Sequence, residues 1–95
     1  MAPMDVDREV EDLREQIAEI DRTILEAVNA RLQLVERLQA HKRSHGLPEL
    51  DMRQEHKVVR ALARANQGPL SERGVRELAG EILELTKREL RLGRS

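Results

Sequence analysis

The 95-residue sequence contains no phenylalanine, tyrosine or tryptophan, and no cysteine. Without aromatic rings, the chain has no stacking platform for single-stranded nucleic acid and no aromatic cage for an organic cation. Without cysteine, it has no disulfide, no thiolate nucleophile and no cysteine-ligated metal site. A cysteine-free chain also fits a reducing compartment, and we expect a cytoplasmic protein.

Long apolar runs and an excess of one charge are also missing. No stretch approaches the ~20 apolar residues of a membrane span, and the amino-terminal segment has no apolar run of signal-peptide length. The 17 Lys and Arg side chains nearly balance the 18 Asp and Glu side chains, which gives a formal net charge of −1. This balance argues against a basic nucleic-acid footprint and against an acidic disordered tail. We therefore expect a soluble globular protein that binds neither nucleic acid nor membrane.

Glycine and proline are absent between Met4 and His45, which predicts one long helix. Its apolar residues recur at alternating spacings of four and three, the pattern of an amphipathic helix with a coiled-coil-like seam. The seam consists of Val6, Val10, Leu13, Ile17, Ile20, Ile24, Val28, Leu32, Val35 and Leu38. Gly46 and Pro48 end the helix, and cationic residues fill its last turns, where they suit the carboxyl end of the helix dipole.

A helix of this length is too long for one small chain to cover. About 40 residues span roughly 60 Å at 1.5 Å per residue. A compact domain of this size has a radius of gyration of only about 12 Å. A chain this short also buries only about 60 to 65% of its unfolded surface when it folds alone. We therefore expect a homodimer in which the long helices pair.

A second helix is predicted after the turn at residues 46–50. Asp51 is a suitable N-cap for a helix that continues through about Ala65. The apolar face of this helix is formed by Val58, Val59 and Leu62.

A third helix follows the helix-breaking segment Asn-Gln-Gly-Pro at residues 66–69. Ser71 is a suitable cap, and apolar residues then repeat at helical spacing up to Gly93. The sequence therefore predicts an all-α fold, a three-helix chain with a long first helix. We expect a single domain over residues 1–95, with a core of about 10–91.

Two cations share the apolar face of the long helix. Arg31 lies three residues after Val28, and Lys42 lies four residues after Leu38. They are eleven residues apart, which is ~16 Å along one helix face. Two long side chains that converge from this separation can hold a small dianion. The alternative is that both side chains extend to solvent.

Arg14 borders the same seam but lies 17 residues before Arg31, about 25 Å away along the helix. It cannot reach the same ligand from its own chain. In an antiparallel dimer, the amino-terminal half of one long helix lies beside the carboxyl-terminal half of the other. The partner's Arg14 would then complete the site.

His41 and His45 have the i, i+4 spacing of two metal ligands on one helix face. The sequence places no carboxylate or third histidine to complete such a site, so we expect no metal.

In their order and spacing, several motifs of this chain together resemble the all-helical, type II (AroQ-class) chorismate mutases. The motifs are Leu13-Arg14-Glu15-Gln16-Ile17 with Ile20-Asp21, then Asn29-Ala30-Arg31, His41-Lys42, Gly46-Leu47-Pro48, Asp51 and Glu55, Asn66-Gln67-Gly68-Pro69-Leu70-Ser71, Leu78, and Glu81-Ile82-Leu83. The resemblance covers roughly residues 10–91 without a gap.

The resemblance implies a three-helix chain that dimerises through its long first helix and takes one arginine of each site from the partner. It implies an isomerase that converts chorismate to prephenate by an intramolecular Claisen rearrangement, in the shikimate pathway to the aromatic amino acids Phe and Tyr. That reaction needs no cofactor, metal or nucleophile. Catalysis consists of holding the flexible dianion in its reactive conformation and stabilising charge on the breaking ether oxygen.

The resemblance also assigns site residues. Arg31 and the partner's Arg14 bind the two substrate carboxylates, to which guanidinium groups are well matched. Lys42 donates to the ether oxygen and to a carboxylate. Contacts near the substrate hydroxyl and on the third helix fall on Asp51, Glu55 and Thr86. Among these residues, we expect the catalytic ones to be Lys42, Arg31 and Glu55.

Two positions depart from the family pattern. The usual second-helix arginine falls on Gln54, with Arg53 displaced by one residue, about 100° around the helix. Either Arg53 substitutes for the arginine, or Gln54 makes a neutral contact in the substrate-binding site. The third-helix Gln or Glu that binds the ether oxygen falls on Leu90, which cannot donate a hydrogen bond.

These departures leave other readings open. The same scaffold resembles isochorismate-pyruvate lyases and mutases of 4-amino-4-deoxychorismate, and Gln54 and Leu90 would favour such a relative. A non-catalytic, ligand-binding regulatory dimer is another class, as is a complex with another shikimate-pathway enzyme. The simplest reading is a coiled-coil dimerisation element, but Arg31 and Lys42 on its buried stripe would then cost stability without return.

Overall fold

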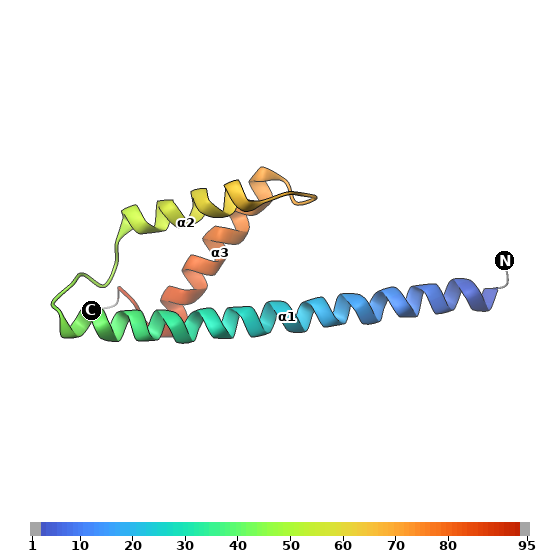
Figure 1. Ribbon diagram of the computed structural model, residues 1–95, viewed down its shortest axis with the longest axis horizontal. Coiled ribbons are helices and arrows are strands. Elements are labelled where there is room, and N and C mark those ends of the chain that lie inside the picture. Colours follow the sequence, from blue (N-terminus) through green and yellow to red (C-terminus); the bar gives the residue numbers. More distant parts are fainter. Residues whose placement is uncertain (1–2, 94–95) are drawn as a thin grey trace. The chain divides into compact units, whose positions relative to one another are not determined.

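The computed structural model describes residues 3–93, which form three α-helices and no strand within that range (Figure 1). Helix α1 spans Pro3–Ser44, α2 spans Met52–Ala65 and α3 spans Glu72–Leu90. The prediction of an all-α, three-helix chain with a long first helix is therefore confirmed. None of the helices in this range is both long and apolar enough to cross a membrane.

Helix α1 is uninterrupted over 42 residues, but the chain divides into two compact units at the boundary between Arg31 and Leu32. In the described part of the first unit, α1 is the whole structure. Its large apolar side chains are exposed there, and Ile20, for example, retains 61% of its surface. The exposed group comprises Val6, Val10, Leu13, Ile17, Ile20, Ile24 and Leu25. The predicted seam therefore has no cover within the described part of its own unit.

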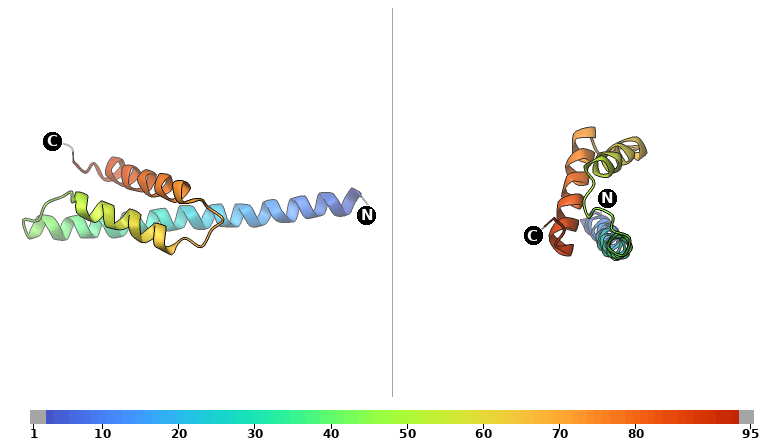
Figure 2. Two further views of the ribbon diagram at one scale, coloured as in Figure 1. Left: turned by 90° about the horizontal axis from the view of Figure 1, so that it is seen from above. Right: turned by 90° about the vertical axis from the view of Figure 1, so that its left-hand side faces the viewer.

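The second unit contains the end of α1 together with α2 and α3, and its core lies where α2 and α3 pack against each other (Figure 2). Val75 and Ala79 of α3 are buried. From α2, Val58 and Val59 are half-buried, in agreement with the predicted apolar face, whereas Leu62 is exposed. This small core brings the first turns of α2 toward the last turns of α3.

Both predicted N-caps are present. The Asp51 carboxylate accepts hydrogen bonds from the backbone N–H groups of Arg53 and Gln54, at 3.0 and 3.3 Å. The Ser71 hydroxyl oxygen accepts from the N–H of Gly74 at 3.0 Å. Each cap satisfies donors that the first turn of a helix otherwise leaves unpaired.

Helix α3 ends at Leu90, three residues before the predicted end at Gly93. The chain leaves the helix at Arg91, whose φ of 56° is left-handed, and the N–H of Leu92 donates to the Lys87 carbonyl at 2.9 Å. This arrangement is a common helix ending that usually uses glycine. The prediction was wrong because the residue that turns the chain here is an arginine.

We expect Ser71→Ala to lower the free energy of unfolding by about 1 kcal/mol, because it removes an N-cap acceptor. Ser71→Asp keeps an acceptor at this position and should retain most of the stability. Urea denaturation at one fixed protein concentration measures both variants. Equal stability of wild type and Ser71→Ala would show that this cap does not help to hold α3.

Candidate functional site

Lys42 is half-buried near the end of α1, and its ammonium group is directed toward the segment that leads into α2. Its Nζ donates to the backbone carbonyl of Glu49 at 3.3 Å. Gln39, one turn earlier and buried, donates from Nε2 to the same carbonyl at 3.1 Å, while its buried Oε1 has no partner. The predicted catalytic lysine is thus anchored two residues before Asp51.

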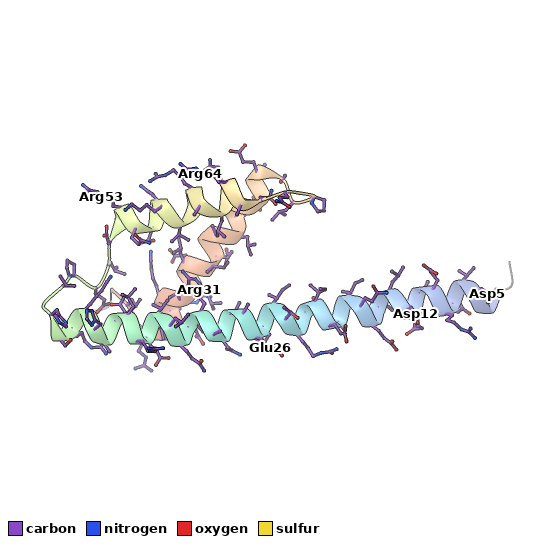
Figure 3. All side chains as sticks on the ribbon, viewed as in Figure 1. Asp5, Asp12, Glu26, Arg31, Arg53 and Arg64 are labelled. Carbon is purple, nitrogen blue, oxygen red and sulfur yellow. The ribbon has the colours of Figure 1, made fainter. Side chains whose placement is uncertain are left out.

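The start of α2 carries three further predicted or alternative site residues. One carboxylate oxygen of Asp51 is used in capping the helix. Gln54 and Arg53 are both exposed, and Figure 3 shows Arg53 at the amino-terminal end of α2. Their backbone N–H groups are held by the same cap, which fixes where each side chain leaves the helix.

Glu55 lies one turn into α2 and forms an ion pair with Lys87 of α3, with 2.9 Å between Glu55 Oε1 and Lys87 Nζ. Both side chains are largely removed from solvent, with 18% and 25% of their surface exposed. The second carboxylate oxygen, Glu55 Oε2, is buried and has no hydrogen-bond partner. Glu55 therefore offers a free acceptor inside the unit, as a substrate-binding carboxylate should.

Lys87 is the one member of this pair that the sequence did not predict. Its hydrogen bond to Glu55 is the main cause that raises its pKa above the usual 10.5, against an opposing effect of burial. A longer contact of 3.4 Å to Glu84 on the same helix adds to the effect. The only sequence signal was position, since Lys87 directly follows the predicted Thr86.

Thr86 is buried on α3, and its hydroxyl donates to the carbonyl of Ile82 at 2.7 Å. A threonine hydroxyl has one hydrogen and two lone pairs. With its hydrogen on the helix backbone, the Thr86 oxygen acts toward other groups only as an acceptor.

The two predicted arginines of α1, Arg14 and Arg31, both lie in the first unit. Arg14 pairs with Glu11 at 3.0 Å, and its side chain is 70% exposed. Such exposed pairs contribute little to stability, so the guanidinium can be released at small cost. Arg31 is half-buried on α1 (Figure 3).

Leu90 is half-buried on α3, one turn after Thr86. It lines an open groove of about 680 Å³ between the end of α1 and the end of α3. The groove is lined by Gln33, Glu36, Arg37, Gln39, Ala40, Arg43, Glu89, Leu90, Arg91 and Leu92. None of the predicted site residues lines this groove.

His41 and His45 stack with ring centroids 4.2 Å apart, and Nδ1 of His45 is 2.9 Å from the His41 carbonyl. Within residues 3–93, no group of three His, Cys, Asp or Glu side chains is placed to hold a metal ion. The histidine pair belongs to the end of α1 and is not part of a ligand set there.

The ion pair should give stability a defined pH dependence. Because the pKa of Lys87 is raised in the folded chain, the pair contributes fully below the usual pKa of 10.5, and its contribution is lost as the pH rises through the raised value. We expect the difference in free energy of unfolding between wild type and Lys87→Met to be constant near neutral pH and to shrink above pH 10.5. Urea denaturation across this range measures it. Lys57→Met, which removes an exposed lysine of α2, is the matched control. If the difference in stability between wild type and Lys87→Met persists unchanged above the raised pKa of Lys87, the ion pair does not cause this pH dependence.

Comparison with known proteins agrees with the geometry. The sequence matches the family described as chorismate mutase type II over residues 13–90. Two solved structures, forms I and II of chorismate mutase from Thermus thermophilus, superpose with TM-scores of 0.79 and 0.80 at 27% and 26% identity. The matches cover 82% and 84% of this chain, and 98% and 91% of those chains. No curated protein sequence matches the chain. Since the family match extends over most of its length, the chain belongs to the chorismate mutase type II family.

Proposed function

We propose that this chorismate mutase binds chorismate through Arg31, Lys42, Asp51, Gln54, Glu55 and Thr86, and that each site is completed by Arg14 from a second copy of the chain. The observation that carries the proposal is the family match over residues 13–90, which includes all seven of these positions. The activity itself, isomerisation of chorismate to prephenate in aromatic amino-acid biosynthesis, is that of the family.

The reaction breaks an ether bond and forms a carbon–carbon bond within one molecule. Since no proton or group is transferred to the protein, the protein contributes by fixing the reactive conformation and stabilising charge. Lys42 is suited to the breaking ether oxygen because the residue is half-buried and its ammonium group is directed toward the segment that leads into α2. When substrate is bound, that oxygen replaces the Glu49 carbonyl as its acceptor.

The substrate carboxylates require cations. Arg31 on α1 supplies one guanidinium, and the partner's Arg14 supplies the other. Guanidinium groups bind carboxylates with two parallel hydrogen bonds, which fix orientation as well as position. Arg14 in its own chain pairs with the exposed Glu11, and this pair does not compete strongly with a substrate carboxylate.

The substrate hydroxyl requires an acceptor, and Glu55 Oε2 is a buried acceptor without a donor. Buried polar atoms are nearly always hydrogen-bonded in native proteins, so an unpaired one supports a ligand at this point. Asp51 and Thr86 add acceptor oxygens, and Gln54 adds a neutral amide in place of the family's arginine.

The exposed seam of α1 supports a homodimer. Seven large apolar side chains of this helix, from Val6 to Leu25, are exposed, and large exposed apolar patches mark protein–protein contacts. A second α1 running antiparallel covers this seam and carries Arg14 toward the partner's Arg31. The cytoplasmic location and a complex with another shikimate-pathway enzyme stay predictions.

Gln54 and Leu90 favour one alternative, a related enzyme on the same fold that acts on isochorismate or on 4-amino-4-deoxychorismate. Both replace polar groups that the family uses on the substrate. Turnover of the three substrates, measured side by side with the same preparation, distinguishes the alternatives.

We expect the wild-type chain to convert chorismate to prephenate, and Lys42→Ala to lower kcat by about 10²- to 10³-fold, because it removes a donor to the ether oxygen. Chorismate consumption with identification of prephenate measures both. Lys57→Ala removes an exposed lysine and should retain full turnover. Equal rates for wild type and Lys42→Ala would contradict the role of Lys42.

Mixing two inactive variants tests the shared site. Arg14→Ala and Arg31→Ala should each be inactive as homodimers. After denaturation and refolding together, a mixed dimer has one site with both arginines and one with neither, so random pairing should restore about a quarter of wild-type activity. If the mixture stays as inactive as its components, Arg14 does not act across a dimer interface.

A further inference from the structure

The Lys87–Glu55 ion pair has features that packing alone does not require. It joins the first turn of α2 to the last turns of α3, at 2.9 Å and with less than a third of either side chain exposed. Removing two charges from water is costly unless their remaining hydrogen-bonding groups are also satisfied. Glu55 Oε2, however, is buried without a donor. One carboxylate oxygen of Glu55 is therefore paired with Lys87, and the other is left without a donor.

The unpaired oxygen, Glu55 Oε2, has a defined direction. A carboxylate has two oxygens in one plane, so fixing Oε1 on Lys87 fixes where Oε2 lies. Lys87 is in turn restrained by its contact with Glu84 at 3.4 Å. Glu84 is a third charged group beside the pair, and its side chain is mostly exposed. The carboxylate of Glu55 is thus oriented before any ligand arrives.

We infer that Lys87 is a positioning residue that orients Glu55 toward the substrate, and that the neutral pair selects a ligand whose donor is an uncharged hydroxyl over one whose donor is an ammonium group. The inference rests on the proposed function, because it assigns Glu55 Oε2 to the substrate hydroxyl.

The selectivity follows from charge. A lone carboxylate attracts an ammonium group more strongly than a hydroxyl. With Lys87 2.9 Å from the same carboxylate, the pair has no net charge, and a ligand ammonium meets the repulsion of a second cation in a partly desolvated place. A hydroxyl donates without this penalty. The family pattern has an arginine on α2 at the position where this chain has Gln54. In this chain, Lys87 supplies a cation near Glu55 from α3.

The test compares Lys87→Met, Lys87→Gln and Lys87→Arg with Lys57→Met as the matched control. The readouts are kcat/KM for chorismate and the inhibition constant of 4-amino-4-deoxychorismate as the ammonium-bearing probe. Circular dichroism confirms that each variant is helical.

We expect Lys87→Met and Lys87→Gln to lower kcat/KM by about 10- to 100-fold through misplacement of Glu55. The amine should inhibit these variants more strongly, relative to chorismate binding, than it inhibits wild type. Lys87→Arg should recover most of each effect, and Lys57→Met should show none.

A purely structural role for Lys87 predicts a different result, in which stability falls while the amine preference stays at its wild-type value. That result, or unchanged kinetics in both neutral variants, overturns the inference alone. If Lys87→Met does not fold, the same decision rests on Lys87→Gln and on the recovery by Lys87→Arg. A wild-type chain without chorismate turnover instead overturns the proposed function, and this inference with it.

Discussion

The apolar seam of α1 is the constraint on which the rest of this protein depends. A helix of 42 residues carries large aliphatic side chains along one face, and in the described part of the unit that ends at Arg31 nothing covers them. Burial of aliphatic surface is the main favourable contribution to folding, and the core around Val75 and Ala79 is small. Pairing of this seam in the proposed homodimer would therefore add much of the stability of the chain. The proposed division of each site between two chains follows from the same requirement, because the partner helix that covers the seam also carries Arg14.

Local chemistry made most of the fold predictable. The absence of Gly and Pro between Met4 and His45 gave the extent of α1, and Asp51 and Ser71 gave the starts of α2 and α3, because a cap bonds to backbone groups only two or three residues away. The end of α3 was predicted wrongly for an equally local reason. The helical pattern was taken to continue up to Gly93, whereas Arg91 already adopts the left-handed conformation that ends the helix. A non-glycine residue adopts it at only a modest energetic cost, and the sequence does not show where that cost is accepted.

The candidate site divides in the same way. Lys42 and Arg31 could be selected from sequence because cations on an apolar helix face are unusual, and Glu55 because the family pattern places an acid there. Lys87 could not, since its partner lies 32 positions earlier and the contact exists only once α2 packs on α3. The hydrogen bond from the Thr86 hydroxyl to the Ile82 carbonyl could not be predicted from the sequence either, because it depends on a side-chain rotamer within the helix. Sequence therefore identified the groups, while packing decided their hydrogen-bonding state.

The Glu49 carbonyl, which accepts from both Gln39 and Lys42, has a consequence for how the connection between α1 and α2 behaves. The two donors are not equivalent, because Gln39 is buried whereas Lys42 is only half-buried. When the ammonium leaves, the carbonyl keeps its amide donor, and the Glu49 side chain still accepts from the backbone N–H of Gly93. The connection is thus held by one hydrogen bond that stays, from Gln39, and by one that a ligand can replace, from Lys42. In the proposed site, a ligand can accept the hydrogen bond of Lys42 while the other hydrogen bonds still hold the segment. The free energy of binding is then not reduced by the cost of reordering the backbone that leads into Asp51.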